Sequence, residues 1–89
     1  MTWKIEIVPS VVKELNKLDQ QVAKRILKFL HKRIASLKDP RSIGSALKGS
    51  RFGEFWRYRV GDYRIITKIE DNILLIIVLR VGHRKQIYN

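Results

Sequence analysis

The chain has no cysteine, only eight acidic residues and no long hydrophobic run. Without cysteine it can form neither a disulfide bond nor a thiolate metal site, which fits a reducing cytoplasm. The longest apolar run, residues 73–79, is far too short to span a bilayer. Residues 1–4 lack the apolar core of a secretory signal peptide. We therefore expect a cytoplasmic protein that does not act at a membrane.

The excess of basic residues is the strongest compositional feature. Nineteen Lys and Arg stand against eight Asp and Glu, a net charge of +11 in 89 residues. A chain of this length forms one domain, residues 1–89, and the self-repulsion of its charge indicates a polyanionic or acidic partner. Residues 1–40 carry seven Lys and two Arg, whereas residues 41–89 carry three Lys and seven Arg. Because arginine holds phosphate bidentately, we expect phosphate chemistry in the second half.

Helical periodicity dominates the first half of the chain. Alternating apolar and polar residues at positions 3–7 predict a short strand before it. Apolar residues at helical spacing then predict a helix over residues 11–18 and a second that runs from the candidate N-cap Asp19 to about residue 37. The second helix ends at Asp39-Pro40, because the residue before a proline disfavours helical geometry.

The second half has the period of two that is typical of strands. A glycine-containing loop at residues 41–53 comes first. Three strands are predicted, over residues 55–60, 63–70 and 73–81, with turns at Gly61-Asp62 and Asp71-Asn72. The last strand is almost wholly apolar, which predicts a central strand covered on both faces. The order β-α-α-β-β-β predicts an α+β fold with two N-terminal helices on a small antiparallel sheet, followed by a short tail.

The strands carry the candidate functional residues. Arg57 and Arg59 are two apart and share one face, whereas the face of Arg64 depends on the hairpin register. Further candidates are Lys48 and Arg51 in the preceding loop, and Arg80, His83, Arg84, Lys85 and Tyr88 at the end of the last strand. Alternating charge on a strand is usually a solvated face. Residues 41–89 hold only four acids to pair with this set, so a phosphate target explains the surplus better.

The chemistry expected of such a surface needs no metal and no cofactor. The acids are scattered, only two histidines are present, and no HExxH, Walker, GxSxG or Rossmann pattern occurs. RNA supplies its own nucleophile, the 2′-OH. Cleavage then requires removal of the 2′ proton, stabilisation of the phosphorane charge and protonation of the 5′-oxygen. Arginines provide the second, while Tyr88 and His83 are candidates for the proton transfers.

Three segments resemble the RelE/ParE toxin superfamily: Leu47-Lys48-Gly49, FWRYRVGDYRI at residues 55–65 and VGHRKQIY at residues 81–88. The resemblance covers essentially the whole chain, and the ending GHRxxIY favours RelE over ParE. It implies a toxin of a toxin–antitoxin pair that cleaves mRNA in the ribosomal A site, leaving a 2′,3′-cyclic phosphate and a 5′-OH. It also implies that a basic face binds rRNA and mRNA, and that a cognate antitoxin protein blocks the toxin.

The resemblance also implies individual roles. Arg57 and Arg59 match basic strand residues near the scissile phosphate, and Arg64 matches a phosphate-binding arginine. Arg84 matches an arginine that stabilises the transition state or protonates the leaving group. Tyr88 matches a tyrosine that orients the nucleotide or acts as base. Two departures stand out: lysines occupy the positions of Arg57 and Arg59 in the best-studied RelE toxins, and His83 replaces a lysine. Because arginine does not give up its proton, a base role at Arg57 or Arg59 is disfavoured.

Three alternatives remain open from the sequence. A ParE-like toxin would inhibit DNA gyrase with the same fold, and a non-catalytic RNA- or ribosome-binding module would use the arginines for affinity alone. The basic second helix could also act at a membrane, but its apolar stripe is needed as core against the sheet.

Overall fold

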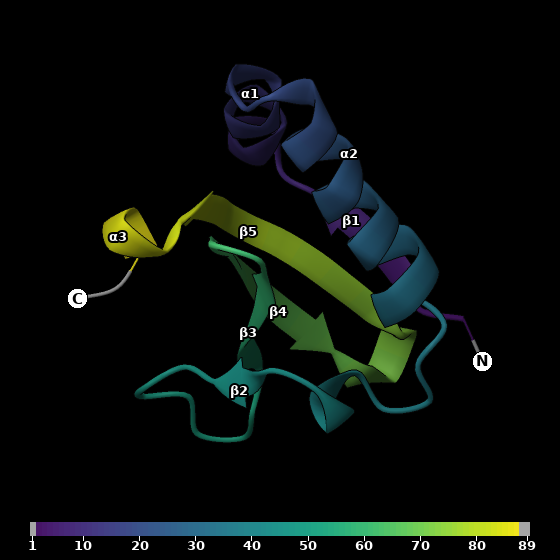
Figure 1. Cartoon of the computed structure of the whole chain (residues 1–89). Coiled ribbons are helices and arrows are strands. Elements are labelled where there is room, and N and C mark those ends of the chain that lie inside the picture. The colour runs from purple at the N-terminus through teal and green to yellow at the C-terminus, as the bar shows by residue number, and fades with distance from the viewer. Residues whose placement is uncertain (1, 88–89) are drawn as a thin grey trace.

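The structure, a computed structural model, describes residues 2–87 (Figure 1). Its elements are β1 (Lys4–Ile7), α1 (Pro9–Lys17), α2 (Gln20–Lys28), the π-helical segment η1 (Phe29–Ile34), the 3-10 turn η2 (Pro40–Ser42), β2 (Ser45–Ala46), β3 (Phe55–Val60), β4 (Tyr63–Glu70), the 3-10 turn η3 (Asp71–Ile73), β5 (Leu75–His83) and α3 (Arg84–Ile87).

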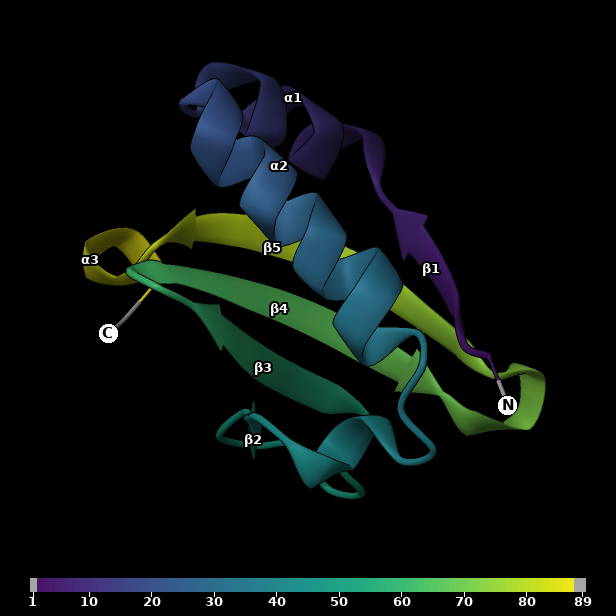
Figure 2. The ribbon, with the colours of Figure 1, turned by 45° about the vertical axis from the view of Figure 1, so that its right-hand side comes forward.

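The predicted α+β class is confirmed, with α1 and α2 packed on one face of the sheet (Figures 1 and 2). The strand order is β1-β5-β4-β3-β2, and every neighbouring pair is antiparallel except β1 and β5. The expectation of a wholly antiparallel sheet was therefore wrong. The alternation at residues 3–7 predicts a strand but not its direction. In Figure 2, α2 carries the chain across the sheet toward β2 and β3, while β1 lies at the opposite edge and pairs in parallel with β5.

The core lies between the helices and this face of the sheet. Asp19 caps α2 as predicted, accepting a hydrogen bond from the Gln21 backbone N–H at 3.1 Å. The apolar stripe predicted for this helix is Val22, Ile26, Leu30 and Ile34; the last three are fully buried and Val22 is half-buried. Such burial stabilises by about 1.5–3 kcal/mol for each large aliphatic side chain. The helix ends in a π-helical segment at Ile34 rather than near residue 37.

Two sequence expectations for the last strand were wrong. β5 is central, but its burial alternates: Ile76 and Val78 are buried, while the residues between and beside them are half-buried. Because an all-apolar run shows no alternation of apolar and polar residues, the sequence does not indicate which face of the strand the helices cover. Burial on one face and burial on both faces therefore give the same sequence pattern. The strand also runs to His83 instead of ending before Gly82, and the short tail begins with the helical turn α3.

Candidate functional site

Three neighbouring strands gather four arginines on the sheet face turned away from α1 and α2. Arg59 on β3 lies directly opposite Arg64 on β4. Arg57 on β3 and Arg80 on β5 both lie opposite the same β4 residue, Ile66. Directly opposed residues of antiparallel strands project to the same side. The register thus answers the question left open for Arg64, and we call these four residues the arginine face.

The four guanidinium groups differ in exposure. Arg59 and Arg80 are exposed, and half-buried Arg57 donates from Nη2 to Ser45 Oγ at 3.4 Å. Arg64 is only 4% exposed, and its Nη1 donates to the carbonyl oxygens of Gly61 and Tyr63 at 3.1 Å each. Arg64 therefore ties down the β3–β4 turn, whereas Arg59 and Arg80 offer charge to a ligand.

The start of the tail closes over one end of the arginine face. Gly82 lies opposite Arg64, and a Cβ at Gly82 would come within 3.2–3.3 Å of Ile87 and Gln86 of α3. Exposed Arg84 begins α3; its backbone N–H donates to the Asp62 carbonyl oxygen at 2.7 Å. The absence of a side chain at position 82 thus permits the close approach of α3.

His83 lies on the other side of the sheet. It pairs with Tyr63, and the two rings meet edge to face with centroids 5.6 Å apart. Its Nδ1 accepts a hydrogen bond from the Lys85 backbone N–H at 3.2 Å. By register the structure therefore separates His83 from the arginine face, although it brings Arg84 and Lys85 to the same end of the sheet. Tyr88, the remaining candidate of the tail, lies outside the described residues.

The loop before β3 carries the predicted RNA-binding residues Lys48 and Arg51, both exposed. The Glu54 carboxylate accepts hydrogen bonds from the backbone N–H groups of Arg51 at 3.3 Å and Phe52 at 2.9 Å. Hydrogen bonds from backbone N–H groups, its own and that of Phe52 foremost, lower the pKa of Glu54. Phe52 itself is 84% exposed at the loop tip, next to Arg51. The loop thus holds a defined shape while presenting two cations.

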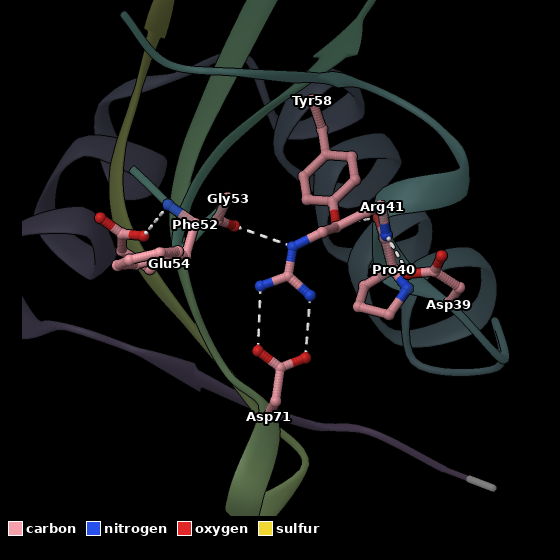
Figure 3. Close-up of polar contacts among 8 residues, drawn as sticks. All are labelled: Asp39, Pro40, Arg41, Phe52, Gly53, Glu54, Tyr58 and Asp71. Carbon is pink, nitrogen blue, oxygen red and sulfur yellow. Dashed lines mark hydrogen bonds and ion pairs between the residues drawn. The ribbon is translucent and has the colours of Figure 1, made fainter. Parts of the chain in front are cut away.

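An ion pair that the sequence analysis missed holds this loop to the sheet (Figure 3). Arg41 donates from Nη1 and Nη2 to the two carboxylate oxygens of Asp71 at 2.8 and 2.9 Å, and from Nε to the Gly53 carbonyl at 2.9 Å. The hydrogen bond with Arg41 lowers the pKa of Asp71. Beside it, the Tyr58 hydroxyl donates to the Pro40 carbonyl, and burial raises the pKa of Tyr58. The sequence predicts a helix end at Asp39-Pro40 and a turn at Asp71, but no local pattern joins residues thirty apart.

A family model described as the ParE toxin of the type II toxin–antitoxin system, parDE, matches residues 5–88. The chain belongs to the RelE/ParE toxin superfamily. Among curated proteins, Toxin RelG of Mycobacterium tuberculosis (strain ATCC 25618 / H37Rv) is 26% identical over 88 residues, covering 99% of this chain and 98% of RelG. The resemblance stated from the sequence is thereby confirmed.

Solved structures of RelE toxins have the same fold as this toxin. The toxin–antitoxin complex RelBE2 from M. tuberculosis matches with a TM-score of 0.80 at 22% identity, covering 94% of this chain and 93% of that one. The archaeal RelE–RelB complex from Pyrococcus horikoshii OT3 matches with a TM-score of 0.73 at 28% identity, covering 94% and 97%. This toxin is therefore a type II toxin with a RelE-like fold.

Within residues 2–87, the His, Asp and Glu side chains form no group of three that could hold a metal ion. No helix in this range combines the length and the apolar character that crossing a membrane requires.

Proposed function

We propose that this toxin is an endoribonuclease that cleaves mRNA on the ribosome. The observation that carries the proposal is the gathering of Arg57, Arg59, Arg64 and Arg80 on one sheet face. Like charges gathered on one face repel one another in the free protein, and an RNA phosphate backbone relieves that repulsion. The RelE-like fold and the GHRxxIY ending support the same reading.

The proposed reaction uses the RNA's own 2′-OH. The 2′-oxygen forms a bond to the adjacent phosphorus as its proton leaves, and the bond from phosphorus to the 5′-oxygen breaks as that oxygen is protonated. The products are a 2′,3′-cyclic phosphate and a 5′-OH. Arg57 and Arg59 stabilise the charge of the phosphorane, because fixed cationic donors bind the transition state more strongly than the ground state. Neither acts as base, since arginine keeps its proton.

Proton transfer belongs to the tail in this proposal. Arg84, which keeps its proton, stabilises the charge of the departing 5′-oxygen as that oxygen takes a proton from water, and Tyr88 orients the nucleotide or accepts the 2′ proton. His83 faces Tyr63, away from the arginine face. Its hydrogen bond from the Lys85 N–H suggests a positioning role, holding the first turn of α3 where Arg84 begins. Lys48, Arg51, Arg80 and Lys85 bind the RNA backbone at the rim.

The proposed partners are an antitoxin protein, mRNA and ribosomal RNA, met in the cytoplasm. The RelBE2 and P. horikoshii relatives were both solved as toxin–antitoxin complexes, which supports an antitoxin for this toxin. Its net charge of +11 suits both an acidic antitoxin and RNA.

The test is a reconstituted translation reaction in which the 5′ ends of the mRNA are mapped. We expect cuts at A-site codons that require ribosomes and fall by at least 100-fold in Arg84→Ala, the scale on which loss of one transition-state donor slows a reaction. Lys13→Ala, an exposed α1 residue, is the control and should cut like the wild type. The proposal would be overturned if the mRNA stayed intact with a wild-type protein that still arrests growth.

One observation favours a second function, inhibition of DNA gyrase: the family model that matches is the one described as ParE. The same preparation is therefore added to a gyrase supercoiling reaction. Supercoiling blocked near one toxin per gyrase, together with intact mRNA, would establish this alternative. Intact mRNA with unimpaired gyrase and saturable ribosome binding would instead indicate a non-catalytic ribosome-binding module.

A further inference from the structure

One edge of the sheet is only partly covered in the described chain. The two-residue strand β2 pairs with Trp56 and Arg57 of β3 and goes no further. The remainder of β3, through Val60, lies at the sheet edge, beside the helical segment formed by α2 and η1. Two adjoining pockets of about 390 Å³ each lie here and share Phe29, Arg33 and Arg59 as walls. We call this continuous depression the α2–β3 groove.

The groove is lined by one face of the second helical segment. Arg25, Lys28, Phe29, Lys32 and Arg33 follow at spacings of three and four residues, so they project from the same side of α2 and η1. The opposite stripe is the buried core, and the basic side is therefore left over for solvent or a ligand. If these lysines served only to solvate the helix surface, their position over the edge of β3 would have no explanation.

The charge of the groove has one sign. Its cations are Arg25, Lys28, Lys32, Arg33, Arg57 and Arg59, and no Asp or Glu of residues 2–87 lines either pocket. Arg25 lies over the β3–β4 turn, since a Cβ at Gly61 would come within 3.2 Å of its Nη1. Phe29 lies among the cations and packs edge to face on Tyr58 at a centroid distance of 6.1 Å. A positively charged groove that also offers an aromatic side chain suits a single strand of RNA.

The groove is continuous with the arginine face. Arg57 and Arg59 belong to both, because β3 is the strand where the face meets the sheet edge. A strand of RNA held at the arginine face can therefore leave over this edge without crossing an acidic surface. This continuity favours RNA as the occupant, because in the proposed reaction the RNA chain already lies at the arginine face and has to leave it over one of its edges.

We propose that the α2–β3 groove is an RNA-backbone subsite that binds the ribose–phosphate chain beyond the scissile phosphate. The inference rests on the proposed ribonuclease function, and it assigns to the helical cations a binding role outside the reaction itself. Its contribution is to affinity: it lowers the KM for RNA and leaves the position of the cut unchanged.

The test compares two matched lysine pairs by their effect on binding of a fluorescent oligouridylate. Lys28→Gln/Lys32→Gln alters the groove, and Lys13→Gln/Lys17→Gln removes the same charge at the same spacing from exposed α1. Each phosphate contact on a single strand contributes about 0.7 to the slope of log affinity against log salt concentration. We expect the groove pair to reduce that slope by about 1.4, twice this value, and the α1 pair to leave it nearly unchanged. Equal slopes in the two variants would overturn the proposal.

A second probe tests the occupant. Poly-glutamate of matched charge should bind the wild type more weakly than the oligouridylate and should not distinguish the two variants. If poly-glutamate instead binds as tightly and loses as much affinity in the groove pair, the groove is a site for an acidic protein and the RNA assignment is wrong. All altered side chains are exposed, and thermal unfolding checks that both variants are folded.

The mRNA assay separates this proposal from the ribonuclease function. If the Lys28→Gln/Lys32→Gln variant cuts mRNA at the same sites with a raised KM, the result supports both the ribonuclease function and the RNA subsite in the groove. If cutting depends on Arg84 but both lysine variants bind the oligouridylate equally well, the ribonuclease function is supported and the proposed RNA subsite is wrong. A reduced slope without any mRNA cleavage removes the function, and the groove is then an RNA site of a non-catalytic protein.

Discussion

At the scale of single residues, Arg41 and Asp71 form a bidentate ion pair. Their two parallel hydrogen bonds, together with the bond from Arg41 Nε to the Gly53 carbonyl, fasten the loop that carries Lys48 and Arg51 (Figure 3). The Asp71 side chain is 59% exposed, so solvent screens the pair and its contribution to stability is modest. Through Arg41, the pair connects the end of this loop at Gly53 to the turn between β4 and β5 at Asp71.

The first prediction follows from the lowered pKa of Asp71. Asp71→Asn should reduce the free energy of unfolding at neutral pH by about 0.5–1 kcal/mol, the range for a screened pair with bidentate geometry. A carboxyl whose pKa is depressed in the folded state stabilises above its unfolded pKa and loses that contribution as pH falls through the folded value. Urea unfolding should therefore show the difference at pH 7 and lose it in strong acid, below the ordinary Asp value of 3.8. A difference that persists unchanged in strong acid would contradict this account.

The approach of β2 to β3 sets the shape of the groove at the scale of elements. Gly44 adopts a φ of +81°, and a Cβ there would collide with the Arg57 carbonyl oxygen and approach the Trp56 indole. The Trp56 Nε1–H donates to the Ile43 carbonyl at 2.7 Å, which fixes the same segment against β3. Glycine at position 44 is thus required for two reasons, its backbone conformation and its lack of a side chain.

Gly49 provides the control for a second prediction. Its φ of +91° is equally strained for other residues, but a Cβ there would meet open space. Gly49→Ala should cost about 1–3 kcal/mol, the range for a non-glycine residue in an unfavourable backbone region. Gly44→Ala adds a collision with backbone and should cost at least about 1 kcal/mol more. Denaturant unfolding of both variants checks this difference, and equal losses would mean that β2 can move away from β3 freely.

The sequence predicts much of this architecture because local signals suffice for it. The Gly61-Asp62 turn and the alternation around it predict the β3–β4 hairpin, which places Arg59 opposite Arg64. The direction of β1, the Arg41–Asp71 pair and the basic walls of the groove all depend on contacts between distant segments. His83 was expected beside the arginines because it is their neighbour in sequence. Strand alternation puts it on the other side of the sheet, next to Tyr63.

The charge distribution unites these features at the scale of the whole molecule. The net charge of +11 is concentrated on the arginine face and the α2–β3 groove, which meet at β3. A core built from one face of the sheet and one stripe of each helix leaves both of these surfaces for a ligand. The fold thus separates the residues that stabilise it from those that are proposed to bind and cleave RNA.

The most direct test of the central claim uses an mRNA with a single 2′-deoxynucleotide at the mapped cleavage position, in the same reconstituted translation reaction. If the 2′-OH is the nucleophile, the all-ribose mRNA is cut to a 2′,3′-cyclic phosphate and a 5′-OH, and the 2′-deoxy mRNA stays intact at that position. Equal cutting of both would mean that another nucleophile attacks the phosphate and that the arginine face serves a different reaction.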